Sequence, residues 1–78
     1  MNQDEALKWF AELFGLPPAG LSPDTPRTKV SDWDSLGVLT LMAALDESFN
    51  IVVNDADMRA MQKVGDVLDL LRKHGKLT

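Results

Sequence analysis

The chain has no cysteine and only one histidine among its 78 residues. Without cysteine it can form no disulfide framework, no thiolate nucleophile and no zinc–thiolate site. The one histidine, His74, lies where the last helix is expected to end, and a positive side chain there offsets the helix dipole. There is no G-x-S-x-G elbow, no phosphate-cradling glycine loop and no set of clustered metal ligands. We therefore expect neither an enzyme nor a metal site.

Long hydrophobic runs and an excess of basic residues are also lacking. No apolar stretch approaches the ~20 residues that span a bilayer, and no basic segment followed by an apolar run marks a secretory signal. Eight Lys and Arg stand against twelve Asp and Glu, a net charge of −4. That balance disfavours nucleic acid and mildly favours partners with basic docking surfaces. We expect a cytoplasmic protein that neither inserts into a membrane nor binds nucleic acid.

The length limits the architecture. A chain of 78 residues is one domain, residues 1–78, and a domain of this size buries only about 60% of its unfolded surface. It can form one modest core, but hardly a deep, walled active site as well. We expect a monomer.

The apolar spacing predicts helices, and the polar residues predict their ends. Asn2 with Glu5 resembles a capping box, and Gly15 with the prolines after it is a natural stop. Asn54 with Asp57 predicts the start of a short helix after the β-branched connector 51–53. The result is an all-α bundle of three main helices and one short helix, with a long loop between the first two helices. The expected ranges are helix 3–14, loop 15–34, helix 35–49, short helix 55–60 and helix 64–73.

The loop 15–34 contains all four prolines. A structureless connection of ~20 residues is unusual in a compact domain. Its apolar residues are spread along its length, so we expect them to fasten the loop to the core: Leu16, Leu21, Val30 and Trp33.

The helix predicted at 35–49 is apolar on two sides. One row is expected to face the core: Val38, Leu41, Met42, Leu45 and Phe49. A second row contains Leu36, Leu39 and Ala43. A helix with two apolar sides is either buried all round or docks onto a partner, and the pattern alone leaves both possibilities open.

Ser35 precedes this apolar pattern and has two possible roles. Serine at a helix start is usually an N-cap, worth about 1 kcal/mol, but the neighbouring Asp34 could do the same work. If Asp34 were the cap, the Ser35 hydroxyl would be free at a helix N-terminus, where a phosphate is well accommodated. From the residues alone, we interpret Ser35 as the cap.

The stretches "DSLGVLTLMAALDESFNI" and "VGDVLDLL" resemble the acyl carrier protein family over about the whole chain. The resemblance implies that Ser35 receives a covalent 4′-phosphopantetheine group from coenzyme A, transferred by a magnesium-dependent phosphopantetheinyl transferase. Asp34 matches the acid of the family motif, which implies that it helps orient the metal and the serine in the transfer complex. Leu36 matches the motif's hydrophobic docking residue. Partners would be enzymes that load acyl or aminoacyl groups and enzymes that transfer or condense them. The implied docking residues are Leu36, Leu39, Ala43, Asp46 and Glu47.

The sequence also departs from the family pattern. Positions that are commonly acidic on the docking helix are Gly37 and Thr40 here. Gly37 is either merely tolerated in the first turn, at a cost of up to ~1 kcal/mol, or lets a partner approach closely, and we favour the first interpretation. We expect docking that relies less on charge. The "WDSL" opening resembles carriers of specialised pathways, so a stand-alone carrier for a fatty-acid, polyketide or cell-surface pathway is favoured. The alternatives are a peptidyl or aminoacyl carrier of a nonribosomal pathway and a non-carrier helical adaptor that binds through Leu36, Leu39 and Ala43.

Overall fold

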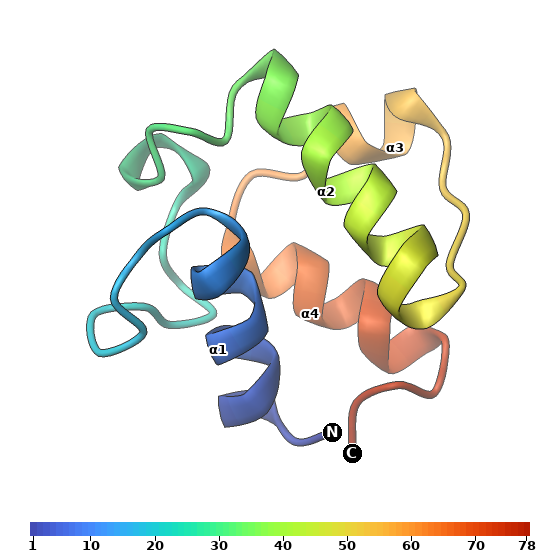
Figure 1. Ribbon diagram of the computed structural model, residues 1–78, viewed down its shortest axis with the longest axis horizontal. Helices are drawn as coiled ribbons and strands as arrows, with labels where there is room; N and C mark the ends of the chain where they lie inside the picture. The colour runs from blue at the N-terminus through green and yellow to red at the C-terminus, as the bar shows by residue number, and fades with distance from the viewer.

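The computed structural model describes residues 1–78 and is built from helices alone (Figure 1). The expected all-α class is confirmed. The helices are α1 (Gln3–Leu13), α2 (Ser35–Phe49), α3 (Asp55–Arg59) and α4 (Val64–Lys73), with one 3-10 turn, η1 (Arg27–Lys29), in the long loop. No helix is long and apolar enough to cross a membrane.

Side-chain caps set the starts of α1 and α3. Asn2 Oδ1 accepts a hydrogen bond from the Glu5 N–H at 2.8 Å, and the Asn2 N–H donates to Glu5 Oε1 at 2.9 Å. At α3, Asn54 Oδ1 accepts from the Asp57 N–H at 2.7 Å. Two helix ends differ by one residue from the ranges expected from the sequence. Phe14 is the C-cap of α1 rather than its last residue, and α3 is one residue shorter than expected.

The core contains apolar side chains from all four helices and from the loops between them. α2 contributes Val38, Leu41 and Leu45, all fully buried, while Met42 and Phe49 are partly buried against the same cluster. These five residues face the core as expected. The other buried members of the cluster are Ala6, Leu7, Phe10, Phe14, Val30, Trp33, Ile51, Met58, Val64, Val67, Leu68, Leu71 and Leu77.

The long loop is fastened to the core by its apolar residues, as expected. Val30 and Trp33 are each 2% exposed, and Leu16 and Leu21 are partly buried against the core. The Trp33 ring packs edge-on against Phe10, with ring centroids 5.2 Å apart. These contacts fix the segment that leads directly into α2.

The loop also adds backbone hydrogen bonds that the sequence did not predict. The Gly65 N–H donates to the Pro23 carbonyl at 2.8 Å, and a Cβ on Gly65 would lie 2.8 Å from that same oxygen. The Arg27 N–H donates to the Gln62 carbonyl at 2.7 Å. The loop is therefore bound to the start of α4 at a distance that requires glycine at position 65.

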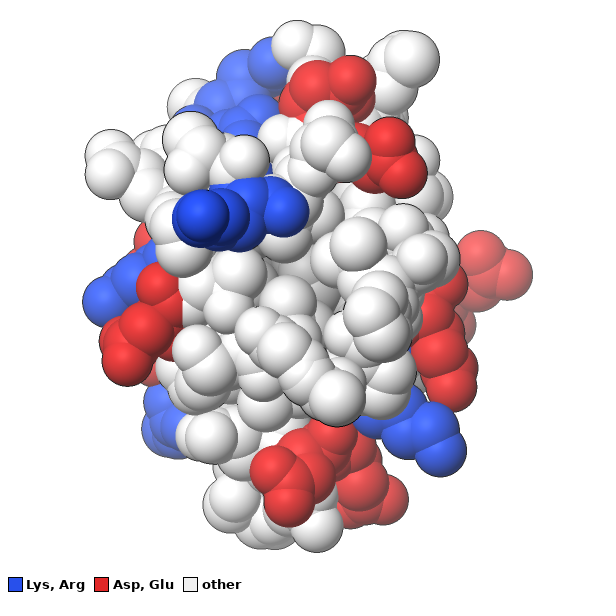
Figure 2. Space-filling model, turned by 90° about the vertical axis from the view of Figure 1, so that its left-hand side faces the viewer, with Lys and Arg blue, Asp and Glu red and all other residues white.

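The two chain termini lie together at one end of the molecule, and α2 begins at the other end (Figure 1). The Met1 amino group donates to the Lys76 carbonyl at 3.2 Å, and the Thr78 N–H donates to the Met1 carbonyl at 2.8 Å. On the face formed by α1 and the long loop, the centre is uncharged, and charged side chains surround it, with one basic side chain in the foreground above the centre (Figure 2).

Candidate functional site

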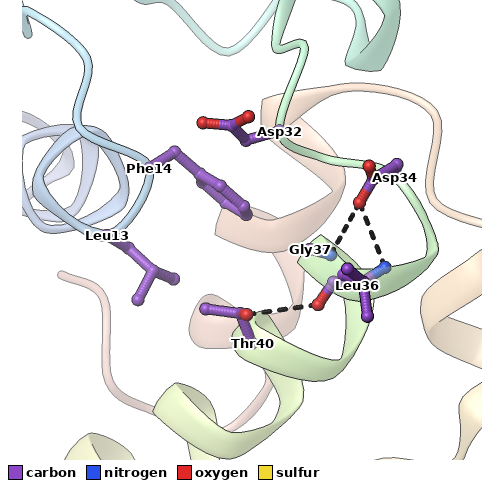
Figure 3. Close-up of a pocket in the computed structure, with 7 residues that line it drawn as sticks. All are labelled: Leu13, Phe14, Asp32, Asp34, Leu36, Gly37 and Thr40. Atoms are coloured by element: carbon purple, nitrogen blue, oxygen red, sulfur yellow. Dashed lines mark hydrogen bonds between the residues drawn. The ribbon is translucent and has the colours of Figure 1, made fainter.

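The first turn of α2 settles which residue caps that helix. Asp34 Oδ1 accepts hydrogen bonds from the N–H groups of Leu36 and Gly37, both at 3.0 Å (Figure 3). Asp34 has extended backbone dihedrals, and Ser35 is the first helical residue. The interpretation of Ser35 as the cap is therefore wrong. A cap side chain must stand before the first helical residue to reach back to these N–H groups, and only Asp34 does so.

The Ser35 hydroxyl is consequently available. The residue is exposed, and its Oγ makes a single polar contact, with Arg59 Nη1 at 3.4 Å. That distance is at the outer limit for a hydrogen bond, so the contact is weak. An exposed hydroxyl with one weak partner is sterically and energetically accessible to an incoming group.

Arg59 is a site residue that the sequence pattern did not reveal. It stands on the last turn of α3, and its Nε donates to Asp55 Oδ2 at 2.6 Å. The Asp55–Arg59 spacing is visible in the sequence as an i,i+4 pair. Nothing in that spacing indicates that the guanidinium also reaches α2, because this contact depends on how α3 packs against α2.

A second arginine joins the two segments of the site. Arg27 Nε donates to the Trp33 carbonyl at 2.8 Å, and Arg27 Nη1 donates to the Arg59 carbonyl at 3.3 Å. The Arg27 guanidinium also lies over the Trp33 ring, 5.6 Å from its centroid. One side chain therefore ties the segment before Ser35 to the end of α3.

A hollow of about 310 Å³ lies beside the Asp34 cap, between the end of α1 and the start of α2 (Figure 3). It is open to solvent, and two carboxylates, those of Asp32 and Asp34, stand at its edge. Ser35 itself does not line it. The lining residues are Leu13, Phe14, Asp32, Asp34, Leu36, Gly37 and Thr40.

Gly37 is required by close packing in this region. It is buried, and a Cβ built on it would fall far inside the contact distance of the Asp32 carbonyl oxygen and 3.2 Å from Phe14 Cε1. The interpretation of Gly37 as a residue merely tolerated in the first turn is therefore wrong. The backbone before Ser35 runs across the helix at this point, and a side chain would push it away.

The other predicted docking residues lie on the outer surface of α2. Leu36 is 74% exposed and Leu39 is 53% exposed, and Ala43, Asp46 and Glu47 are also exposed. The second apolar row is thus not buried within this chain. Thr40 belongs to the same exposed side, where its Oγ1 donates to the Leu36 carbonyl at 3.1 Å.

Comparisons with known proteins point to one kind of molecule. No protein-family model matches the chain. An acyl carrier protein of Kineococcus radiotolerans is 30% identical over 71 residues, which cover 86% of this chain and 88% of that protein. An acyl carrier protein of Acidothermus cellulolyticus is 27% identical over 75 residues, covering 91% and 89%. A meromycolate extension acyl carrier protein of Mycobacterium leprae is 23% identical over 77 residues, covering 94% and 67%.

Proposed function

The chain belongs to the acyl carrier protein family, and we propose that its Ser35 is the attachment point of a 4′-phosphopantetheine arm that carries acyl groups as thioesters. Members of this family are carriers, not catalysts, so the protein is not an enzyme. The observation that supports this choice of residue is that Asp34, not Ser35, caps α2. Asp34 supplies the cap, and the Ser35 hydroxyl is left exposed with one weak contact.

The attachment reaction makes one bond and breaks one. Ser35 Oγ attacks the phosphorus of coenzyme A that bears the pantetheine, and an Oγ–P bond forms. The bond from that phosphorus to the bridging pyrophosphate oxygen breaks, and adenosine 3′,5′-bisphosphate leaves. The hydroxyl proton passes to a base of the phosphopantetheinyl transferase.

The residues around Ser35 fit a phosphate-linked group. Ser35 opens a helix of 15 residues, and the dipole of such a helix favours negative charge at its start. The Arg59 guanidinium on α3 stands within 3.4 Å of Oγ. When attached, the arm supplies the thiol that a chain without cysteine lacks.

The exposed side of α2 is the surface that we propose for partner enzymes. It begins beside Ser35 and is apolar at Leu36, Leu39 and Ala43, with Asp46 and Glu47 one turn further along. Exposed leucines gathered on one helix face are typical of protein docking sites. Because the first two turns of this surface carry no acidic side chain, we expect docking that depends little on salt.

The pathway and location are part of the same proposal. The "WDSL" opening and the likeness to meromycolate extension acyl carrier proteins favour a specialised pathway, one that builds fatty acids, polyketides or cell-surface components. Coenzyme A, the donor of the arm, is available in the cytoplasm, and we place the carrier there. An aminoacyl cargo of a nonribosomal pathway would use the same serine. The identity of the enzyme that loads the arm distinguishes this alternative from an acyl cargo.

The decisive experiment is a mass measurement. The purified protein is incubated with coenzyme A, Mg²⁺ and a broad-specificity phosphopantetheinyl transferase, and its intact mass is recorded. We expect a gain of one phosphopantetheine group in the wild type and none in Ser35→Ala.

Serines that are exposed but lie outside the site provide matched controls. Ser31→Ala and Ser48→Ala should both gain the full mass. A wild-type protein that stays unmodified would instead support the adaptor interpretation, in which the α2 surface alone binds a partner. Modification that persists in Ser35→Ala would show that another residue is the attachment point.

A further inference from the structure

The Arg59 guanidinium contacts two neighbouring side chains, and it has N–H donors left over. Its Nε donates to Asp55 Oδ2 at 2.6 Å, and its Nη1 lies 3.4 Å from Ser35 Oγ. Arginine has five N–H groups in a planar fork, and the remaining ones make no hydrogen bond within the protein. With the side chain 44% exposed, this end of the fork is open to a ligand attached at Ser35.

The Arg27 side chain links the backbone at Arg59 to the backbone just before Ser35. Arg27 bonds the carbonyl of Trp33, two residues before Ser35, and also the carbonyl of Arg59. Trp33 is itself buried in the core. The start of α2 and the end of α3 are thus joined through a fixed side chain, and Asp55 orients the Arg59 fork from its own helix.

Carboxylates lie near Ser35, so a cation at this place would offset their repulsion of a phosphate. Asp34 precedes the serine, Asp55 is paired with Arg59 on α3, and Asp32 and Asp34 edge the hollow on the α1 side. A phosphodiester at Ser35 would add one more negative charge to this acidic surrounding. Arg59 is the only cation whose side chain contacts Ser35. Guanidinium groups bind phosphate oxygens through charge-assisted hydrogen bonds, often two at a time.

We propose that Arg59 binds the phosphodiester formed at Ser35 and thereby holds the base of the arm on the α3 side of α2. This inference rests on the proposed function, because it requires a phosphate at Ser35. It assigns no part of the attachment chemistry to Arg59, which acts as a positioning residue. The side opposite α3 contains the hollow with its two carboxylates, which repel a phosphate (Figures 1 and 3).

The test uses the protein before and after modification by coenzyme A and a transferase. In wild-type protein, we expect the ¹H–¹⁵Nε resonance of Arg59 to move on modification. In the modified protein, we expect the ³¹P resonance to shift on Arg59→Gln and to shift less on Arg59→Lys, which keeps the charge but loses the fork. Raising the salt concentration from 0.1 M to 1 M, which shortens the Debye length from about 10 Å to about 3 Å, should move the wild-type ³¹P resonance toward that of Arg59→Gln.

Arg72 provides the matched control. It too is an exposed arginine paired with an aspartate on its own helix, Asp69, at 2.8 Å. It belongs to the last turn of α4, away from the start of α2 (Figure 1). The Nε resonance of Arg72 should not change on modification, and Arg72→Gln should leave the ³¹P resonance in place.

The possible failures are distinguishable by mass. If the wild type gains no mass, the proposed function and this inference are both overturned. If the mass gain occurs but the Arg59 resonance stays unchanged, or the ³¹P resonance responds equally to Arg59→Gln and Arg72→Gln, the role of Arg59 alone is refuted.

Discussion

Replacing Gly37 with alanine tests how tightly the segment before Ser35 is packed on α2. The added Cβ would fall far inside contact with the Asp32 carbonyl oxygen and 3.2 Å from Phe14 Cε1. The oxygen belongs to backbone that is held on its C-terminal side. The Trp33 N–H donates to the Val30 carbonyl at 2.9 Å, and the Trp33 ring is buried. The clash therefore cannot be relieved by turning a side chain.

Two opposing effects set the size of the change. Alanine gains about 1 kcal/mol over glycine in helix propensity. Overpacking a well-filled site costs about 1–3 kcal/mol and occasionally more, and a clash with fixed backbone belongs at the upper end of that range. We expect Gly37→Ala to lower the free energy of unfolding by about 2 kcal/mol. A domain of 60–100 residues loses about 4–8 °C in Tm per kcal/mol, so the expected drop is about 12 °C.

The assay is urea and thermal unfolding followed by far-UV circular dichroism. Gly20→Ala is the matched control, because Gly20 does not have a positive φ and no atom lies within 4 Å of a Cβ built there. This control should change the free energy of unfolding by no more than about 1 kcal/mol, in the stabilising direction if at all. A Gly37→Ala protein more stable than the wild type would refute the reasoning, since helix propensity would then outweigh the clash.

Two further pairs of substitutions test the cap and the surface that follows it. Asp34→Ala removes the acceptor for the Leu36 N–H and should cost about 1 kcal/mol of stability in urea unfolding, whereas Asp34→Asn should retain most of it; equal losses in both variants would show that the cap is not the reason. The pair Leu36→Ala and Leu39→Ala, at exposed positions, should leave the free energy of unfolding within about 0.5 kcal/mol. The same pair should slow modification by the transferase at subsaturating carrier concentration, and an unchanged rate would exclude this face from docking.

The helices were largely predictable because their signals are local. A cap such as Asn2 and its partner Glu5 stand three residues apart, and the apolar period of α2 is visible without knowing what packs on it. The exposure of Leu36 and Leu39 was left open by the pattern, since a second apolar row is compatible with burial or with docking. Only the packed structure decides between these two outcomes.

The features that sequence reasoning missed depend on the exact register of a helix start or on packing that no local pattern signals. The choice between Asp34 and Ser35 as cap turns on which residue is the first helical one, a difference of a single position. Gly37 carries no sign that the Asp32 carbonyl approaches it, and Arg59 carries no sign that it reaches Ser35. Gly37 and Arg59 look ordinary in the sequence because the groups that they approach lie outside their own helices.

The pairing of the two chain ends has a practical consequence for studying the protein. The Thr78 N–H and the Thr78 hydroxyl both donate to the Met1 carbonyl, at the end of the molecule away from the start of α2. An affinity tag, a fluorophore or a surface linkage at either end would therefore emerge far from Ser35. Immobilised through its termini, the carrier would present its serine outward to any enzyme supplied in solution.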